Sequence, residues 1–181
     1  ADIRALPPVP DGDGELFDVV IRAKNGEGER RLERMRLALP GLHNVLNALA
    51  VIVVARELGI ADEVVRHALS GLEGVKRRFT RTGTVDGVTI IDDYGHHPVE
   101  IRAVLRTARA RTQGRVVAVV QPHRYSRLAG LFDEFCTCFN DADTVLVAPV
   151  YAAGEPPLAG IDRDALAEGL RRHGHRDVRA I

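Results

Sequence analysis

Apolar and polar residues follow different patterns in successive parts of the chain. Early on, apolar side chains at every second position predict strands over residues 15–23 and 30–39, joined by a polar turn, with Met35 out of step by one. From Leu42 apolar residues recur at intervals of three and four until Gly59. That segment is predicted to be a helix, apolar almost all round and therefore largely buried.

Beyond this helix, short β-branched runs alternate with amphipathic segments. Asp62 is expected to cap a helix that runs to about Leu72, and a hairpin is predicted to turn at Asp86 and Gly87. Further elements are expected at residues 98–111 (helix), 115–121 (strand), 126–141 (helix), 144–150 (strand), 162–173 (helix) and 177–181 (strand). This order indicates an α/β fold with a parallel sheet, in which ligands bind at the carboxyl ends of the strands.

Composition narrows the classes of function. The 181 residues include 25 Lys and Arg against 25 Asp and Glu, so no net field indicates a nucleic-acid or membrane partner. The longest apolar run, residues 48–55, is too short to span a bilayer, and no signal peptide is recognised. Cys136 and Cys138 are expected to be buried or free thiols in a reducing cytosol. We therefore expect a cytoplasmic protein that binds small molecules.

A first polar cluster, DDYGHHP, follows the strand that ends near Ile91. Asp93 could accept hydrogen bonds from ribose hydroxyls, and His96 or His97 could contact a phosphate or a reacting carboxyl group. Alternatively, Asp92 is a local turn acceptor and the histidines cap the helix that starts near Pro98. A metal site is less well supported, because no H-x-x-x-H or C-x-x-C motif completes a ligand set.

A second cluster, QPHRYSR, follows the run that ends at residue 121. His123, Arg124 and Arg127 precede or open a predicted helix, where backbone N–H groups favour anions. The arginines would share a helical face if the helix begins by Arg124. The cluster predicts a clamp for phosphate or carboxylate, or else a solvated basic turn.

A third cluster, GLHNVLNA, opens the long apolar helix. Asn44 is explained by N-capping, but Asn47 needs a ligand or a tertiary contact, because asparagine is a poor interior helix residue. An amide is suited to pairing with a purine edge. No G-x-x-x-x-G-K-[ST] phosphate loop is present in the sequence, and the loop-like ADIRALPPVPDGDG at residues 1–14 suggests a fragment.

In order, PGLHNVLNALA, GVKRRF, DDYGHHPVEI, QPHRYSR and VYAAGE resemble motifs of the Mur ligases, over roughly residues 30–181. The resemblance implies residues 1–75 as the end of a central ATPase domain and residues 76–181 as an incomplete Rossmann-like carboxyl-terminal domain. Leu128 departs from the polar residue expected at the end of its motif.

The resemblance also implies roles for individual residues. Contacts to ATP are implied for His43, Asn44, Asn47, Arg78 and Asp93. Catalytic contacts to the phosphates, the acyl phosphate or the incoming amino acid are implied for His96, His97, His123, Arg124 and Arg127. No metal ligand is implied within the chain, and those of Mg²⁺ are expected outside it.

The activity implied is ATP-dependent joining of L-alanine to UDP-N-acetylmuramate through an acyl phosphate, in peptidoglycan synthesis. The 181 residues alone are expected to be inactive, because the phosphate loop and the UDP-sugar domain are missing from them. Two alternatives stay open. One is a ligase that recycles a preformed tripeptide, and the other is a non-catalytic nucleotide-binding module.

Overall fold

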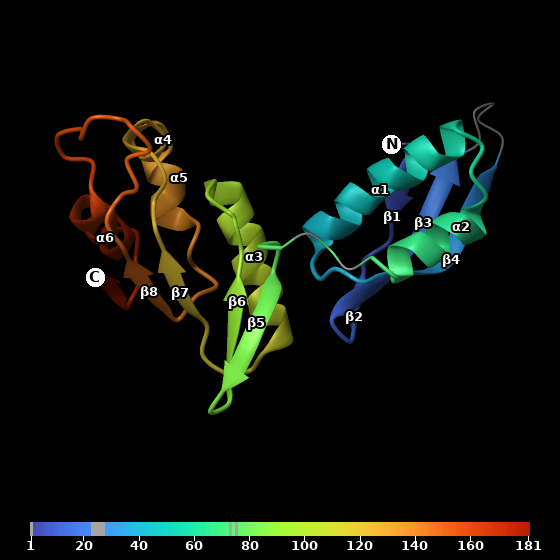
Figure 1. Ribbon diagram of the computed structural model, residues 1–181, viewed down its shortest axis with the longest axis horizontal. Coiled ribbons are helices and arrows are strands. Elements are labelled where there is room, and N and C mark those ends of the chain that lie inside the picture. The colour runs from blue at the N-terminus through green and yellow to red at the C-terminus, as the bar shows by residue number, and fades with distance from the viewer. Residues whose placement is uncertain (1, 23–27, 73, 75) are drawn as a thin grey trace. The chain divides into compact units, whose positions relative to one another are not determined.

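The computed structural model describes residues 2–22, 28–72, 74 and 76–181 (Figure 1). The chain divides into two compact units, Ala1–Asp93 and Tyr94–Ile181, each with its own architecture. None of the described helices combines the length and the apolar character that crossing a membrane requires. The predicted domain boundary at residue 75 stays a prediction.

The first unit contains an antiparallel sheet built on one central strand. Its strands are β1 (Ile3–Ala5), β2 (Val9–Asp11), β3 (Gly14–Arg22) and β4 (Glu29–Leu37). β1, β2 and β4 all pair with β3, so the described part of the segment that we expected to be loop-like contributes two short strands. The two long strands were predicted, while residues 23–27 of the expected strand end and turn lie outside the described residues. Pro10 is tolerated because β2 is a short edge strand.

The displaced Met35 has a structural cause in a β-bulge. Phe17 pairs with Met35 and Val19 with Leu32, so β4 carries one more residue than β3 between these pairs. Arg34, in the bulge, has a φ of 53°, and its N–H donates to the Asp18 carboxylate at 2.7 Å. The bulge returns Leu32 and Met35 to the same buried face, which a strict alternation would separate.

Helices α1 (Leu42–Glu57) and α2 (Asp62–Ser70) belong to the same unit. The buried stripe of α1 joins the core of the first unit and consists of Val45, Ala48, Ile52 and Ala55. The prediction of a largely buried helix was wrong, because Leu46, Val51, Val54 and Leu58 are exposed. A single packed face accommodates one helical stripe, and α1 is apolar beyond it.

The start of α2 also differs from expectation. Ala61, not Asp62, occupies the N-cap position. Asp62 lies in the first turn, where a carboxylate is stabilised by the positive end of the helix, and it forms an ion pair with Arg30.

Strands β5 (Thr80–Val85) and β6 (Val88–Asp92) form the predicted hairpin. Asp86 and Gly87 have φ values of 50° and 79°, as a two-residue turn with both central residues left-handed requires. The turn position is therefore confirmed.

The second unit contains a parallel sheet in the order β7-β8-β9, which confirms the predicted α/β class. Its elements are α3 (Pro98–Arg111), β7 (Val117–Val120), α4 (Tyr125–Gly130), α5 (Phe132–Thr137), β8 (Thr144–Val147), α6 (Arg163–Arg172) and β9 (Val178–Ala180). The helix predicted over residues 126–141 is broken at Leu131, whose φ and ψ are −129° and 28°. Gly130 precedes the break, and glycine is costly inside a helix.

Cys136 and Cys138 are both buried and free, as predicted. Burial raises the pKa of the Cys136 thiol, and it raises the pKa of the Cys138 thiol to about 12. The thiolate forms needed for nucleophilic or redox chemistry are therefore disfavoured.

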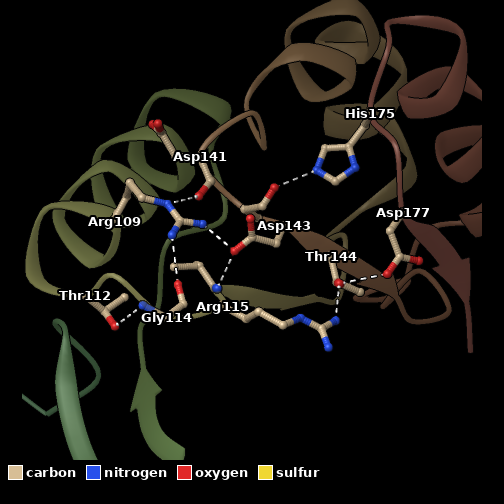
Figure 2. A network of polar contacts seen from close by, with 11 residues as sticks. Arg109, Thr112, Gly114, Arg115, Asp141, Asp143, Thr144, His175 and Asp177 are labelled. Atoms are coloured by element: carbon tan, nitrogen blue, oxygen red, sulfur yellow. Dashed lines mark hydrogen bonds and ion pairs between the residues drawn. The ribbon is translucent and has the colours of Figure 1, made fainter.

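The amino-terminal ends of the parallel strands are held by a polar network (Figure 2). The Asp143 carboxylate accepts from the N–H of Val116 at 2.7 Å and pairs with Arg109. The Thr144 hydroxyl donates to Asp177 at 2.8 Å. Hydrogen bonds from Val116 and Arg109 lower the pKa of Asp143 and thus favour its carboxylate form. This carboxylate and the Arg109 guanidinium hold the start of the sheet.

Candidate functional site

The predicted clusters of the second unit meet through their aromatic rings. His96 comes from the segment before α3, His123 follows β7, and Tyr151 follows β8. The rings of His96 and His123 lie 5.9 Å apart, and the His123 ring stacks on Tyr151 at 5.3 Å. Tyr94 contacts His96 edge-on at 5.2 Å. The structure therefore brings His96 and His123 together, with tyrosines on either side that the sequence analysis had not selected.

His97 has a defined structural role. It occupies the N-cap position of α3, and its Nδ1 accepts from the N–H of Val99 at 3.4 Å. In return, Glu100 accepts from the N–H groups of His96 and His97, each at 3.1 Å. The capping alternative is confirmed for His97, and its catalytic role stays a prediction.

Arg124 has a strained backbone at the start of α4. Its φ and ψ are 72° and 135°, a region that costs a non-glycine residue of the order of 1–3 kcal/mol. Its N–H donates to the carbonyl of Tyr151 at 2.9 Å. The helix begins at Tyr125, so Arg124 does not share a helical face with Arg127 as we had considered. Strain of this kind concentrates at functional positions.

Arg127 fixes the protonation state of His123. Its Nη1 lies 3.1 Å from the Nδ1 of His123 and donates to the carbonyl of His123 at 3.0 Å. A guanidinium can only donate, so this Nδ1 must accept, and the ring proton is on Nε2. His123 thus has a neutral ring with an N–H available to donate toward an anionic oxygen.

The electrostatic surroundings of His123 agree with this assignment. Burial lowers the pKa of His123 most, and the charges of Arg127 and Arg124 lower it further. Because the folded pKa lies below the unfolded value of about 6.5, the unfolded state binds more protons as the pH falls through that value. His123 therefore favours the folded state above this pH, and this contribution to folding stability is lost as the pH falls through the lower, folded pKa.

We expect Arg127→Gln to raise the pKa of His123 toward its ordinary value, because the substitution removes a positive charge beside the ring. An NMR titration of the His123 ring carbons in the full-length protein measures this shift, and ring ¹⁵N shifts report the tautomer. Arg172→Gln on α6 is the matched control. An unchanged His123 pKa in the Arg127 variant, or a proton on Nδ1 in the parent, would contradict the assignment.

The third cluster begins α1 in the first unit. The buried Asn44 donates from its amide to the carbonyl of Pro40 at 2.7 Å, and Gly41 occupies the N-cap position. Asn44 is thus satisfied by the backbone that precedes the helix, not by capping it. Asn47 is exposed, and its side chain makes no hydrogen bond to any described residue. Of the two amides, Asn47 is the better placed for a ligand.

His43 has a polar atom that no protein group satisfies among the described residues. Its Nδ1 is buried and has no hydrogen-bond partner there. Burial lowers the pKa of His43, while the charge of Asp93 raises it and that of Arg78 lowers it again. The three predicted residues are therefore close enough to interact within the first unit.

Asp93 and Arg78 lie at the ends of the hairpin. The Asp93 carboxylate accepts from the N–H of Phe79 at 2.7 Å. Phe79 and Arg77, on either side of Arg78, have positive φ values of 51° and 62°. Asp93 therefore has a local structural role in addition to any contact with a ligand. The turn acceptor expected from the sequence was Asp92, so this contact of Asp93 was not predicted.

Polar side chains near Arg124 that the sequence analysis did not select include Ser126 and Glu155, and the Ser126 hydroxyl donates to Glu155 at 2.6 Å. The signal was present in VYAAGE, whose final glutamate follows the second parallel strand. Among the described residues, no three His, Cys, Asp or Glu side chains gather in a geometry suited to a metal ion.

QPHRYSR follows β7 and VYAAGE follows β8, so both motifs lie at the carboxyl ends of parallel strands. Residues 77–181 match the family described as Mur ligase, glutamate ligase domain. This chain belongs to the Mur ligase family.

Particular relatives narrow the comparison. UDP-N-acetylmuramate–L-alanine ligase of Nitrobacter winogradskyi is 60% identical over 178 residues, which is 98% of this chain and 38% of that protein. The enzyme of the same name from Methylobacterium nodulans is 60% identical over 181 residues, 100% of this chain and 38% of that protein. The crystal structure of UDP-N-acetylmuramate-alanine ligase from Thermotoga maritima aligns with a TM-score of 0.75 and 28% identity, covering 99% of this chain and 37% of that one. The chain thus spans about two fifths of the length of the curated relatives it matches.

Proposed function

We propose that this chain is part of an ATP-dependent ligase that joins L-alanine to UDP-N-acetylmuramate in peptidoglycan synthesis. The observation that carries this proposal is the 60% identity to UDP-N-acetylmuramate–L-alanine ligases across nearly the whole chain. The reaction takes place in the cytoplasm, where the free thiols of Cys136 and Cys138 persist.

The first unit supplies side chains for ATP. Asn47 has an exposed amide suited to a purine edge, and the unsatisfied buried Nδ1 of His43 fits a polar ligand that completes its hydrogen bonding. Asp93 offers a carboxylate for ribose hydroxyls and Arg78 a guanidinium for the nucleotide. ATP supplies the phosphoryl group that activates the muramyl carboxylate, and Mg²⁺ accompanies it through ligands outside this chain.

The second unit supplies side chains for the transfer of the acyl group. Arg124 and the Nε2–H of His123 can donate to the oxygens of the acyl phosphate or to the carboxylate of alanine. Arg127 acts partly through His123, because its guanidinium bonds both the ring and the carbonyl of that residue. His96 lies beside the His123 ring, and its Nδ1 donates to the carbonyl of Tyr94 at 3.0 Å, so its neutral ring offers Nε2 as an acceptor. Catalysis here consists of positioning and charge stabilisation.

The full-length enzyme tests the proposal directly. It is incubated with ATP and UDP-N-acetylmuramate together with L-alanine, glycine or a preformed tripeptide, and products are measured by mass spectrometry alongside phosphate release. We expect alanine-dependent phosphate release and a product that carries one alanyl residue. A product formed with the tripeptide alone would favour the recycling ligase. ATP binding without any ligated product would favour the nucleotide-binding module.

A further inference from the structure

The Glu155 carboxylate accepts both hydrogen bonds that Ser126 donates. Ser126 lies at the start of α4, after β7, and Glu155 lies in the loop after β8. Its Oε2 accepts from the N–H of Ser126 at 2.9 Å, and its Oε1 accepts from the Ser126 hydroxyl at 2.6 Å. The two residues lie 29 positions apart, so this contact joins the start of α4 to the loop after β8. The Ser126 N–H belongs to the first turn of α4, whose backbone donors are otherwise available to anions.

The segments that follow β7 and β8 are also joined by two backbone hydrogen bonds, at Pro122 and at Arg124. The N–H of Tyr151 donates to the carbonyl of Pro122 at 2.8 Å, and the N–H of Arg124 donates to the carbonyl of Tyr151 at 2.9 Å. These bonds continue the parallel pairing beyond the strands, with His123 opposite Tyr151. Arg124, with its left-handed backbone, thus lies between two anchors that both come from residues 151–155.

Glu155 itself is oriented by its own loop. Its N–H donates to the carbonyl of Ala152 at 3.0 Å, in a turn where Ala153 has a φ of 50°. Hydrogen bonds from Ser126 lower the pKa of Glu155, and the charge of Arg124 lowers it further. Glu155 is therefore a carboxylate at neutral pH, with one oxygen for each donor of Ser126.

We propose that Glu155 is a positioning residue, which holds the first turn of α4 through Ser126 and thereby keeps Arg124 in its strained, functional conformation. The proposal rests on the proposed function, because Arg124 acts there on the reacting oxygens. Glutamine is a poor substitute, because its amide group has one acceptor oxygen where the carboxylate has two. Glu155 acts through Ser126 and does not contact the substrate.

Steady-state kinetics of Glu155→Gln, Ser126→Ala and Glu155→Asp in the full-length enzyme test the proposal. We expect Glu155→Gln to lower kcat roughly threefold to tenfold while KM for ATP stays within about twofold. Ser126→Ala removes one of the two donors and should lose less, and Glu155→Asp should recover part of the loss. Glu168→Gln, an exposed glutamate on α6, is the matched control and should behave as the parent.

A double-mutant cycle with Arg124→Lys separates positioning from general destabilisation. If Glu155 acts through Arg124, Glu155→Gln should cost little further turnover in the Arg124→Lys background. A loss of the same size in both backgrounds, or parental kcat in Glu155→Gln, overturns the proposal. Should Glu155→Gln fail to fold, parental kcat in Ser126→Ala overturns it instead.

Hydrogen exchange distinguishes failure of this inference from failure of the proposed function. Amides in residues 124–127 should exchange faster in full-length Glu155→Gln than in the parent, whatever reaction the enzyme performs. An inactive parent would refute the proposed function, and exchange at the parental rate in the variant would refute the positioning role.

Discussion

Arg124→Lys is expected to lower the turnover number of the full-length enzyme by at least about tenfold. Lysine keeps the positive charge but loses the planar fork that donates to two oxygens at once. The two residues also bear the same penalty for the left-handed backbone at this position, where φ is 72°. The substitution therefore isolates the guanidinium from the strain. Interactions made with charge that develops during the reaction act on kcat more than on ground-state binding.

Arg172→Lys is a suitable control, because Arg172 is an exposed arginine on α6 that pairs with Glu168. Ordinary surface substitutions change stability by no more than about 0.5 kcal/mol, and a thermal melt verifies this for both variants. A well-folded Arg124→Lys enzyme with parental turnover would place Arg124 in a solvated turn and remove it from the site.

Periodicity predicted most elements of the fold, because each depends on which face of a segment is apolar. The hairpin at Asp86 and Gly87 and the helix from Pro98 to Arg111 follow from local turn and capping chemistry. The predictions were wrong where tertiary packing determines which residues are buried or where a helix ends. The sequence of α1 does not reveal which apolar stripe is buried, and the break at Leu131 depends on the path of the chain after Gly130.

The candidate site was only partly predictable from polar residues that follow strands. His96 and His123 were both expected near the carboxyl end of a strand, but β6, which precedes His96, pairs with β5 in an antiparallel hairpin and is not part of the parallel sheet. The contact between the two rings therefore does not follow from the rule for parallel sheets. The bond between Ser126 and Glu155 joins residues 29 apart, and no local pattern specifies it. The positive φ of Arg124 was equally hidden, since arginine does not signal a left-handed backbone.

Asp93→Ala is expected to raise KM for ATP by roughly ten- to a hundredfold, because a hydrogen bond to a charged acceptor contributes about 1.5–3 kcal/mol. KM for alanine should stay nearly unchanged. The structure adds a complication, because the carboxylate also accepts from the N–H of Phe79 at 2.7 Å. Alanine removes both contacts and could disturb the backbone around Arg78, whose neighbours have positive φ values.

Asp93→Asn resolves this ambiguity, since its amide oxygen can still accept from Phe79 while the negative charge is lost. A ribose contact predicts that Asp93→Asn raises KM for ATP nearly as much as Asp93→Ala, with a melting temperature close to the parental value. A purely structural role predicts that asparagine restores both binding and stability. Asp92→Asn is the matched control, because the adjacent Asp92 makes an exposed ion pair with Arg77 at 3.5 Å, of a kind that contributes little. An ATP constant that changes equally in the Asp92 and Asp93 variants would show that the charge of the turn matters and that Asp93 makes no specific contact.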